Sequence, residues 1–160
     1  MIFRPTYVFK SVTDISFDFL EENNIKALIL DLDNTLTTHN NPHPAEKVTD
    51  WIDDLKNSGI KMMIVSNNRA ERVIPFAQNL GLDFVPNGRK PLATGFKKAQ
   101  AIMEIPFSEI AIVGDQIFTD ILGANLKRVR TIYVHPIQIE SGFFFKIKRF
   151  FEKPFIRKFK

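Results

Sequence analysis

Short apolar runs alternate with helix-length segments along most of the chain. The runs are apolar at successive positions and partly β-branched, which is typical of strands buried on both faces. We predict strands over residues 27–30, 61–65, 83–85, 110–113 and 130–134. This alternation predicts an α/β protein with a three-layer, Rossmann-like fold, in which helices cover both faces of a five-stranded parallel sheet.

The segments between these runs have helical patterns and helix-ending residues. We predict helices over residues 44–57, 71–80, 92–103 and 118–126. Pro44 falls in the first turn of the first helix and Gly59 follows its end, while Gly81 follows the second helix. The pattern covers one domain, residues 1–142, and leaves residues 143–160 as a separate tail.

Polar residues follow three of the predicted strands. Asp31 and Asp33 come after the first strand, Ser66 and Asn67 after the second, and Asp115 after the fourth. Ligands of open parallel sheets bind beyond the carboxyl ends of the strands, near a topological switch point. We therefore expect these residues to form one site.

Asp31 and Asp33 are suited to phosphoryl chemistry. A carboxylate directly after a buried run is costly unless a cation compensates it. One carboxylate can attack phosphorus to form an aspartyl-phosphate, and the other can protonate the leaving oxygen and then activate water. The alternative is structural: Asp31 ends a strand and Asp33 caps a helix.

Asp115 would complete an oxygen-rich magnesium site. Mg²⁺ is bound by a few carboxylates together with water and phosphate oxygens. Side chains of Asp31 and Asp115 and the backbone carbonyl of Asp33 would supply such ligands. Asp115 could instead cap a helix. Asp120 could orient water or Asp115, or be a solvated helix residue, and the sequence leaves that choice open.

The remaining polar candidates would bind phosphate. The Ser66 hydroxyl and the backbone N–H of Asn67 could hold phosphate oxygens, although both residue types are common in turns. Lys90 could neutralise charge that develops on the phosphate, with neighbouring Arg89 as a rival for that role. Taken alone, Lys90 could equally be a surface lysine.

Composition narrows the class of protein. The 160 residues are 44% apolar and 25% charged, as in a globular domain, and no cysteine is present for a disulfide or a thiolate metal site. The N-terminus lacks the apolar stretch of a signal peptide, and no segment approaches the ~20 apolar residues of a membrane span. We expect a cytoplasmic protein.

The net charge of +4 comes from the tail. Residues 143–160 contain seven Lys or Arg, one Glu and seven Phe, whereas the other residues contain fifteen Lys or Arg and seventeen Asp or Glu. The high isoelectric point therefore does not indicate a nucleic-acid-binding surface on the domain.

The tail has the pattern of an interfacial amphipathic helix. One helical face would hold Phe143, Ile147, Phe150 and Phe151, and another Lys146, Arg149 and Lys153. Pro154 would bend or end the helix and leave 155–160 as a second basic-aromatic piece. We expect docking on an anionic membrane. The alternatives are a helix that packs its Phe residues on the domain with its lysines in water, and stacking on single-stranded nucleic acid.

Together these residues resemble the haloacid dehalogenase (HAD) superfamily of phosphohydrolases, from about Ile25 to Val134. Residues 28–36 resemble its first motif, which implies that Asp31 is the nucleophile and Asp33 the general acid/base. Ser66 and Lys90 match the second and third motifs. Residues 114–120 resemble the fourth, which serves the metal, here Mg²⁺, and their form is similar to subfamily IIIA. The opening stretch resembles YqeG-type proteins, which are similar to mitochondrial phosphatases of phosphatidylglycerophosphate.

Motif spacing predicts that no cap domain covers the site. Asp33 and Ser66 are 33 residues apart, and Ser66 and Lys90 are 24 apart, too few for an inserted domain. An open site suits a phosphate carried by a protein, a nucleic-acid end or a lipid headgroup. It also needs another way to exclude water, such as a partner subunit in a homo-oligomer.

Three functions follow as hypotheses. The first is a phosphatidylglycerophosphate phosphatase, peripheral on the inner face of the membrane. The second is a soluble phosphatase of a nucleotide, a sugar phosphate or a phosphoprotein. The third is a non-catalytic binding module with the same fold, against which stands the presence of every residue that the mechanism needs.

Overall fold

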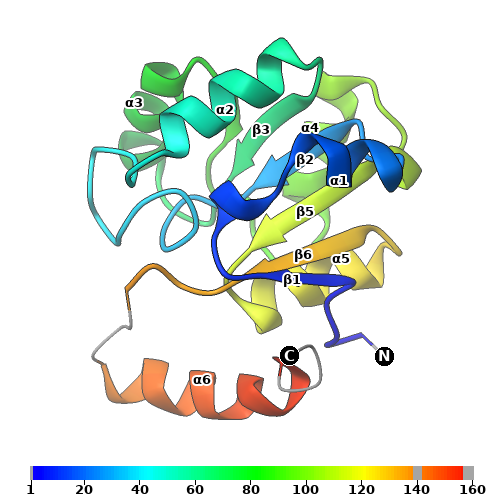
Figure 1. The fold of residues 1–160 in the computed structure, drawn as a ribbon. Helices are drawn as coiled ribbons and strands as arrows, with labels where there is room; N and C mark the ends of the chain where they lie inside the picture. Colours follow the sequence, from blue (N-terminus) through cyan, green and yellow to red (C-terminus); the bar gives the residue numbers. More distant parts are fainter. Residues whose placement is uncertain (1, 139–141, 157–160) are drawn as a thin grey trace.

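A computed structural model describes residues 2–138 and 142–156 (Figure 1). Its parallel strands are β1 (Tyr7–Phe9), β2 (Ala27–Leu30), β3 (Lys61–Val65), β4 (Asp83–Val85), β5 (Ile110–Gly114) and β6 (Arg130–Val134). The predicted strands are confirmed, but the prediction of five was wrong, because β1 adds a sixth at the edge. Three residues are too few to show a periodicity, and β1 is fixed by pairing with β6.

Helices cover both faces of the sheet. The helical elements are η1 (Val12–Asp14), α1 (Phe17–Glu22), α2 (Val48–Asn57), α3 (Ala70–Leu80), α4 (Thr94–Met103), η2 (Phe107–Glu109), η3 (Ile117–Ile121), α5 (Leu122–Leu126) and α6 (Phe143–Ile156). Side chains alternate along each strand, so Leu28 and Leu30 pack with α1, α2 and α3, whereas Ala27 and Ile29 pack with α4 and α5. The predicted three-layer α/β fold is confirmed.

Some helix boundaries differ from the predicted ones. The predicted helix 44–57 begins only at Val48, and 92–103 begins at Thr94. The predicted helix 118–126 is a π-helical turn, η3, that continues into α5. Gly81 ends α3 with φ of +66°, a left-handed conformation that glycine adopts without strain.

The order of the strands in the sheet determines where the candidate site lies. The sheet runs β1-β6-β5-β2-β3-β4, so the chain proceeds from β2 outward to β4 and then returns to the other side of β2 as β5. The direction of winding therefore changes between β2 and β5, where Leu30 lies beside Val113. Asp31 and Asp115, one and two residues further on, leave the sheet side by side at this switch point.

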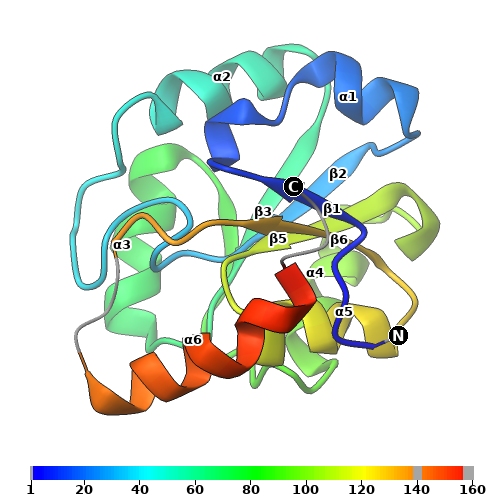
Figure 2. The same cartoon turned by 60° about the horizontal axis from the view of Figure 1, so that its bottom comes forward.

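Helix α6 lies outside the two helical layers, against the segment that follows β5 (Figures 1 and 2). Pro154 does not end the helix, because α6 continues to Ile156 with Pro154 inside it; the alternative, a bend at Pro154, stays a prediction. Residues 157–160 of the predicted second piece, and the side chain of Phe143, lie outside the described part. No described helix is long and apolar enough to cross a membrane.

Candidate active site

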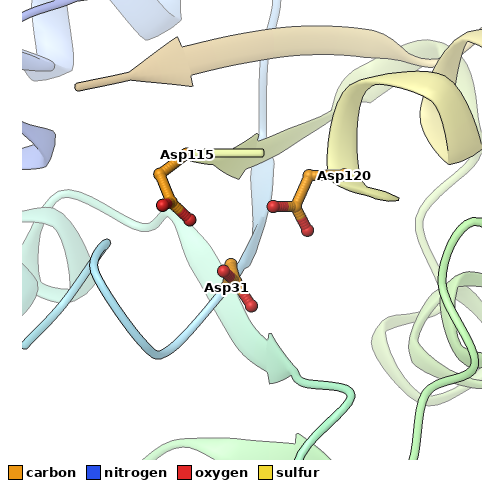
Figure 3. Close-up of side chains that lie close together, drawn as sticks. All are labelled: Asp31, Asp115 and Asp120. Atoms are coloured by element: carbon orange, nitrogen blue, oxygen red, sulfur yellow. The ribbon is translucent and has the colours of Figure 1, made fainter. Parts of the chain in front are cut away.

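Three carboxylates converge beyond the sheet. Asp31 follows β2, Asp115 follows β5 and Asp120 belongs to η3, and their side chains point toward one another (Figure 3). One oxygen from each lies within 4.8 Å of the other two. Asp115 and Asp120 are buried, and Asp31 is partly exposed. The structure thus places Asp120, whose role the sequence left open, inside the cluster.

Burial and mutual repulsion disfavour ionisation in this cluster. Burial, followed by the charge of Asp31, raises the pKa of Asp115 well above its usual range, and Arg149 only partly offsets this. The same two causes raise the pKa of Asp120 to about 7, against the opposing effect of Lys90. Three carboxylates at this distance therefore need more positive charge than these side chains supply.

The cluster fits a divalent cation. Within the described part of the chain, Asp115 Oδ1 and Asp120 Oδ2 are buried and have no hydrogen-bond partner. A buried carboxylate oxygen without a partner is costly, and a hard cation would bind to it. The donors are all oxygens, which are the ligands of Mg²⁺ and similar ions rather than of softer metals. Asp31, Asp115 and Asp120 would hold it.

Gly114 makes the close approach of Asp120 possible. A Cβ atom at this position would lie 2.2 Å from Asp120 Oδ2 and 2.3 Å from its Cγ. No side chain can be accommodated there unless Asp120 moves. Gly114 and Asp115, at the end of β5, thus contribute to the cluster in two ways. Asp115 supplies a carboxylate, and Gly114 leaves space for the carboxylate of Asp120.

The Asp33 side chain lies beside the cluster and not within it. Its Oδ1 accepts from Arg72 Nη2 at 3.0 Å and its Oδ2 accepts from Asn68 Nδ2 at 3.0 Å. Both partners follow β3, so they hold the Asp33 carboxylate toward the neighbouring strand end. This position suits the predicted acid/base role, and the predicted metal contact through its backbone carbonyl stays a prediction.

Lys90, and not Arg89, reaches the carboxylates. Its Nζ donates to Asp31 Oδ1 at 2.7 Å and to Asp120 Oδ1 at 2.5 Å, whereas Arg89 is exposed. Burial disfavours the charged form of Lys90, but the charges of Asp120 and Asp31 outweigh that effect and raise the pKa of Lys90. The side chain of Asn67 exchanges two hydrogen bonds with the Lys90 backbone, at 2.7 and 3.0 Å, and so fixes this lysine.

An open cavity of about 450 Å³ lies over these groups. Its lining residues are Asp31, Asp33, His39, Asn40, Ser66, Asn67, Asn68, Lys90, Gln116, Thr119 and Lys148. Ser66 is buried, and its Oγ accepts from Asn68 N at 3.1 Å. The predicted phosphate-binding pair, Ser66 and Asn67, is thus on the cavity wall, as are the predicted catalytic residues Asp31, Asp33 and Lys90. No cap domain interrupts the chain between them.

Helix α6 contacts the site through its charged residues. Arg149 Nη2 donates to Asp115 Oδ2 at 2.6 Å, and Glu152, which is fully buried, accepts from Ile117 N at 2.9 Å. Arg149, which we predicted to lie on a basic face apart from Phe150 and Phe151, thus pairs with a buried carboxylate of the domain. Phe155 packs against Phe3, as the domain-packing alternative expected of the tail's Phe residues.

Three other apolar side chains of α6 are exposed. Ile147, Phe150 and Phe151 are 41%, 68% and 58% exposed. The helix therefore turns Arg149 and Glu152 to the domain and these three apolar side chains to its surroundings, whereas a surface helix ordinarily packs its apolar face on the core.

Several site residues were not predicted from the sequence. Arg72 and Asn68 occupy ordinary helix or turn positions, where nothing in the pattern distinguishes them, and Gln116 and Thr119 lie within the fourth motif but were not assigned a role. Lys148 was one of seven basic residues of the tail. These residues reach the site because the fold brings their segments together. The one sequence signal that could have located any of them was their closeness to Ser66 and Asp115.

Comparison with known proteins agrees with the class that the fold and the site define. The model of the haloacid dehalogenase-like hydrolase family matches residues 10–134. The chain therefore belongs to the haloacid dehalogenase-like hydrolases. Within that family, its likeness to a probable phosphatase supports phosphatase activity.

One relative supports this assignment, and two solved structures share the fold. The probable phosphatase YqeG of Bacillus subtilis is 36% identical over 151 residues, which are 94% of this chain and 88% of that protein. The fold resembles the cobalt-bound deoxy-D-mannose-octulosonate 8-phosphate phosphatase of Haemophilus influenzae (TM-score 0.56, 16% identity, 79% and 75% covered). It also resembles a 4-nitrophenylphosphatase of Thermotoga maritima (TM-score 0.61, 12% identity, 74% and 89% covered). At these identities the two structures show the fold alone.

Proposed function

We propose that the chain is a Mg²⁺-dependent phosphomonoesterase that acts on a lipid phosphate, phosphatidylglycerophosphate, at an anionic membrane surface. One observation carries the choice of a lipid. The exposed apolar side of α6, made of Ile147, Phe150 and Phe151, belongs to the same helix that lines the catalytic cavity with Lys148. A helix that inserts these side chains among lipids would bring the cavity to the headgroups.

The residues of the site divide the reaction between them. Asp31 attacks phosphorus and forms an aspartyl-phosphate, while Asp33 gives its proton to the leaving alcohol oxygen. Asp33 then takes a proton from water, which attacks the aspartyl-phosphate, releases phosphate and restores Asp31. Lys90, Ser66 and Asn67 hold the phosphate oxygens. Bound Mg²⁺ would neutralise phosphate charge beside Asp31, Asp115 and Asp120.

Phosphate release from vesicles tests the proposal. The purified full chain with Mg²⁺ is expected to release phosphate from phosphatidylglycerophosphate in anionic vesicles, and Asp31→Asn is expected to release none. If the wild type cleaves soluble phosphoesters but not this lipid, the choice of a lipid substrate is wrong and a soluble substrate is favoured.

A matched pair of variants tests the membrane contact. Phe150→Ser with Phe151→Ser is expected to lose vesicle binding and activity on vesicles but to keep activity on p-nitrophenyl phosphate. Ile102→Ser with Leu126→Ser removes two other exposed apolar side chains, 54% and 57% exposed, and is expected to bind vesicles normally. Equal behaviour of the two double variants would exclude a specific role for α6.

A further inference from the structure

The docking of α6 fixes its position relative to the catalytic cavity. Arg149 binds the carboxylate and the backbone oxygen of Asp115, at 2.6 and 2.5 Å, and also pairs with Glu152 at 2.9 Å. Glu152 in turn accepts from Ile117 N. These contacts join α6 to the segment that carries a metal-binding candidate. A charged pair that is buried in this way has a defined geometry and not a loose surface contact.

This docking brings Lys148 to the cavity. Its Nζ donates to Gln116 Oε1 at 2.6 Å, and Gln116 also accepts from the hydroxyl of Thr119 at 3.1 Å. All three side chains line the same cavity as Asp31 and Ser66. The C-terminal helix therefore supplies part of the cavity wall.

Charge distinguishes Lys148 from the other cations around the site. Lys90 pairs with two carboxylates, Arg72 with one, and Arg149 with two. Among the residues that the structure describes, Lys148 forms no ion pair, and it donates its hydrogen bond to a neutral amide. Among the described Lys and Arg residues around the cavity, Lys148 therefore has the charge that is left to meet an incoming anion.

We propose that Lys148 is a substrate-binding residue, which holds an anionic phosphate oxygen of the substrate while Arg149 and Glu152 position it. The inference rests on the proposed phosphatase function and deepens it, since it makes the C-terminal helix part of the substrate site. The oxygen belongs either to the phosphate that is cleaved or to a second phosphate of the same substrate. A hydrogen bond between charged partners in a partly enclosed cavity is strong enough for either role.

Replacement of Lys148 provides the test. Lys148→Met keeps the length of the side chain and removes the charge, and Lys146→Met does the same at an exposed position of the same helix. In the full chain with Mg²⁺, Lys148→Met is expected to raise KM about tenfold or more with little change in kcat. Lys148→Arg is expected to restore most of the loss, and Lys146→Met to match the wild type on soluble substrates.

Two substrates separate the two sources of the anion. If Lys148 holds the phosphate that is cleaved, KM rises equally for p-nitrophenyl phosphate and for a soluble glycerol ester that carries a phosphodiester beside its phosphomonoester. If it holds the second phosphate, KM rises only for the latter. An unchanged KM for both substrates in Lys148→Met would overturn the inference.

Binding of inorganic phosphate keeps this test independent of the proposed activity. Calorimetry with the Mg²⁺-loaded protein is expected to show weaker phosphate binding in Lys148→Met than in Lys146→Met if Lys148 holds the cleaved phosphate. Absence of hydrolysis by the wild type on every ester would refute the proposed function. Normal hydrolysis by the wild type, with kinetics and phosphate binding unchanged in Lys148→Met, would refute only the role of Lys148.

Discussion

The two walls of the catalytic cavity are held in place in different ways. On one side, Asp31 and Asp115 follow β2 and β5, two strands that pair in the middle of the sheet and are buried on both faces. On the other side, Lys148 is carried by a helix that contacts the domain through Arg149, Glu152 and a few apolar side chains at its end. The strand ends can move only if the core is disturbed, whereas α6 depends on a few contacts, so we expect that loss of one of them releases it alone.

The most severe test removes the nucleophile from the rigid wall. Asp31→Asn keeps the shape of the side chain but cannot form an aspartyl-phosphate, so we expect phosphatase activity to fall by about 10⁴-fold or more. Thermal unfolding should show a folded protein. Residual activity within tenfold of the wild type would contradict the role of Asp31.

The second test disturbs the cluster without changing a carboxylate. In Gly114→Ala, the new methyl group would meet the Asp120 carboxylate at 2.2 Å, so Asp120 must move. We expect a loss of stability of about 1–3 kcal/mol by overpacking, together with clearly weaker Mg²⁺ binding. Denaturant unfolding and calorimetric titration with Mg²⁺ measure the two effects.

Gly59→Ala is the control for that variant. A Cβ at Gly59 meets nothing within 4 Å, but its φ of +89° makes any side chain strained. This variant should therefore lose stability and keep its Mg²⁺ affinity. If Gly114→Ala also keeps its Mg²⁺ affinity, the close approach of Asp120 to Gly114 has no importance for the metal.

The sequence predicted the wall formed by the strand ends much better than the wall formed by α6. Five strands and the residues at their ends could be located because a buried strand needs a continuous apolar run, and polar residues directly after such a run are conspicuous. Strand β1 was missed, because its three residues depend on β6 for their structure. For α6, the amphipathic pattern predicted a helix but not its orientation. Glu152 and Arg149 matter for the docking of α6 only because they bind Ile117 N and Asp115.

A third test releases α6 and leaves the strand ends intact. Glu152→Gln removes the charge that pairs with Arg149 inside the interface and replaces one acceptor oxygen by a donor. A buried partner left unpaired costs about 1–3 kcal/mol, which is enough to weaken the docking of a single helix. Hydrogen exchange should rise in α6 and at Ile117, but not in β2 or β5.

Lys153→Gln provides the comparison for this third test. Lys153 is exposed on the same helix, and its replacement should leave hydrogen exchange of α6 unchanged. Exchange that rises equally in both variants would mean that the buried contacts of Glu152 do not hold the helix.

The smallest expected effect concerns pH and follows from the raised pKa of Asp120. In protein stripped of metal with EDTA, the folded state keeps a proton on Asp120 up to about pH 7, whereas the unfolded chain loses it near 3.8. The folded state therefore binds more protons between these values, so its stability should fall as pH rises through this window.

Mg²⁺ competes with that proton for Asp120, so a fixed Mg²⁺ concentration should raise Tm more at pH 8 than at pH 6. Melting curves with EDTA and with Mg²⁺ across this range measure both trends, and Asp120→Asn should reduce them. An increase in Tm on adding Mg²⁺ that is the same at both pH values would show that Asp120 is ionised throughout, and that the charge of Lys90 already compensates the cluster.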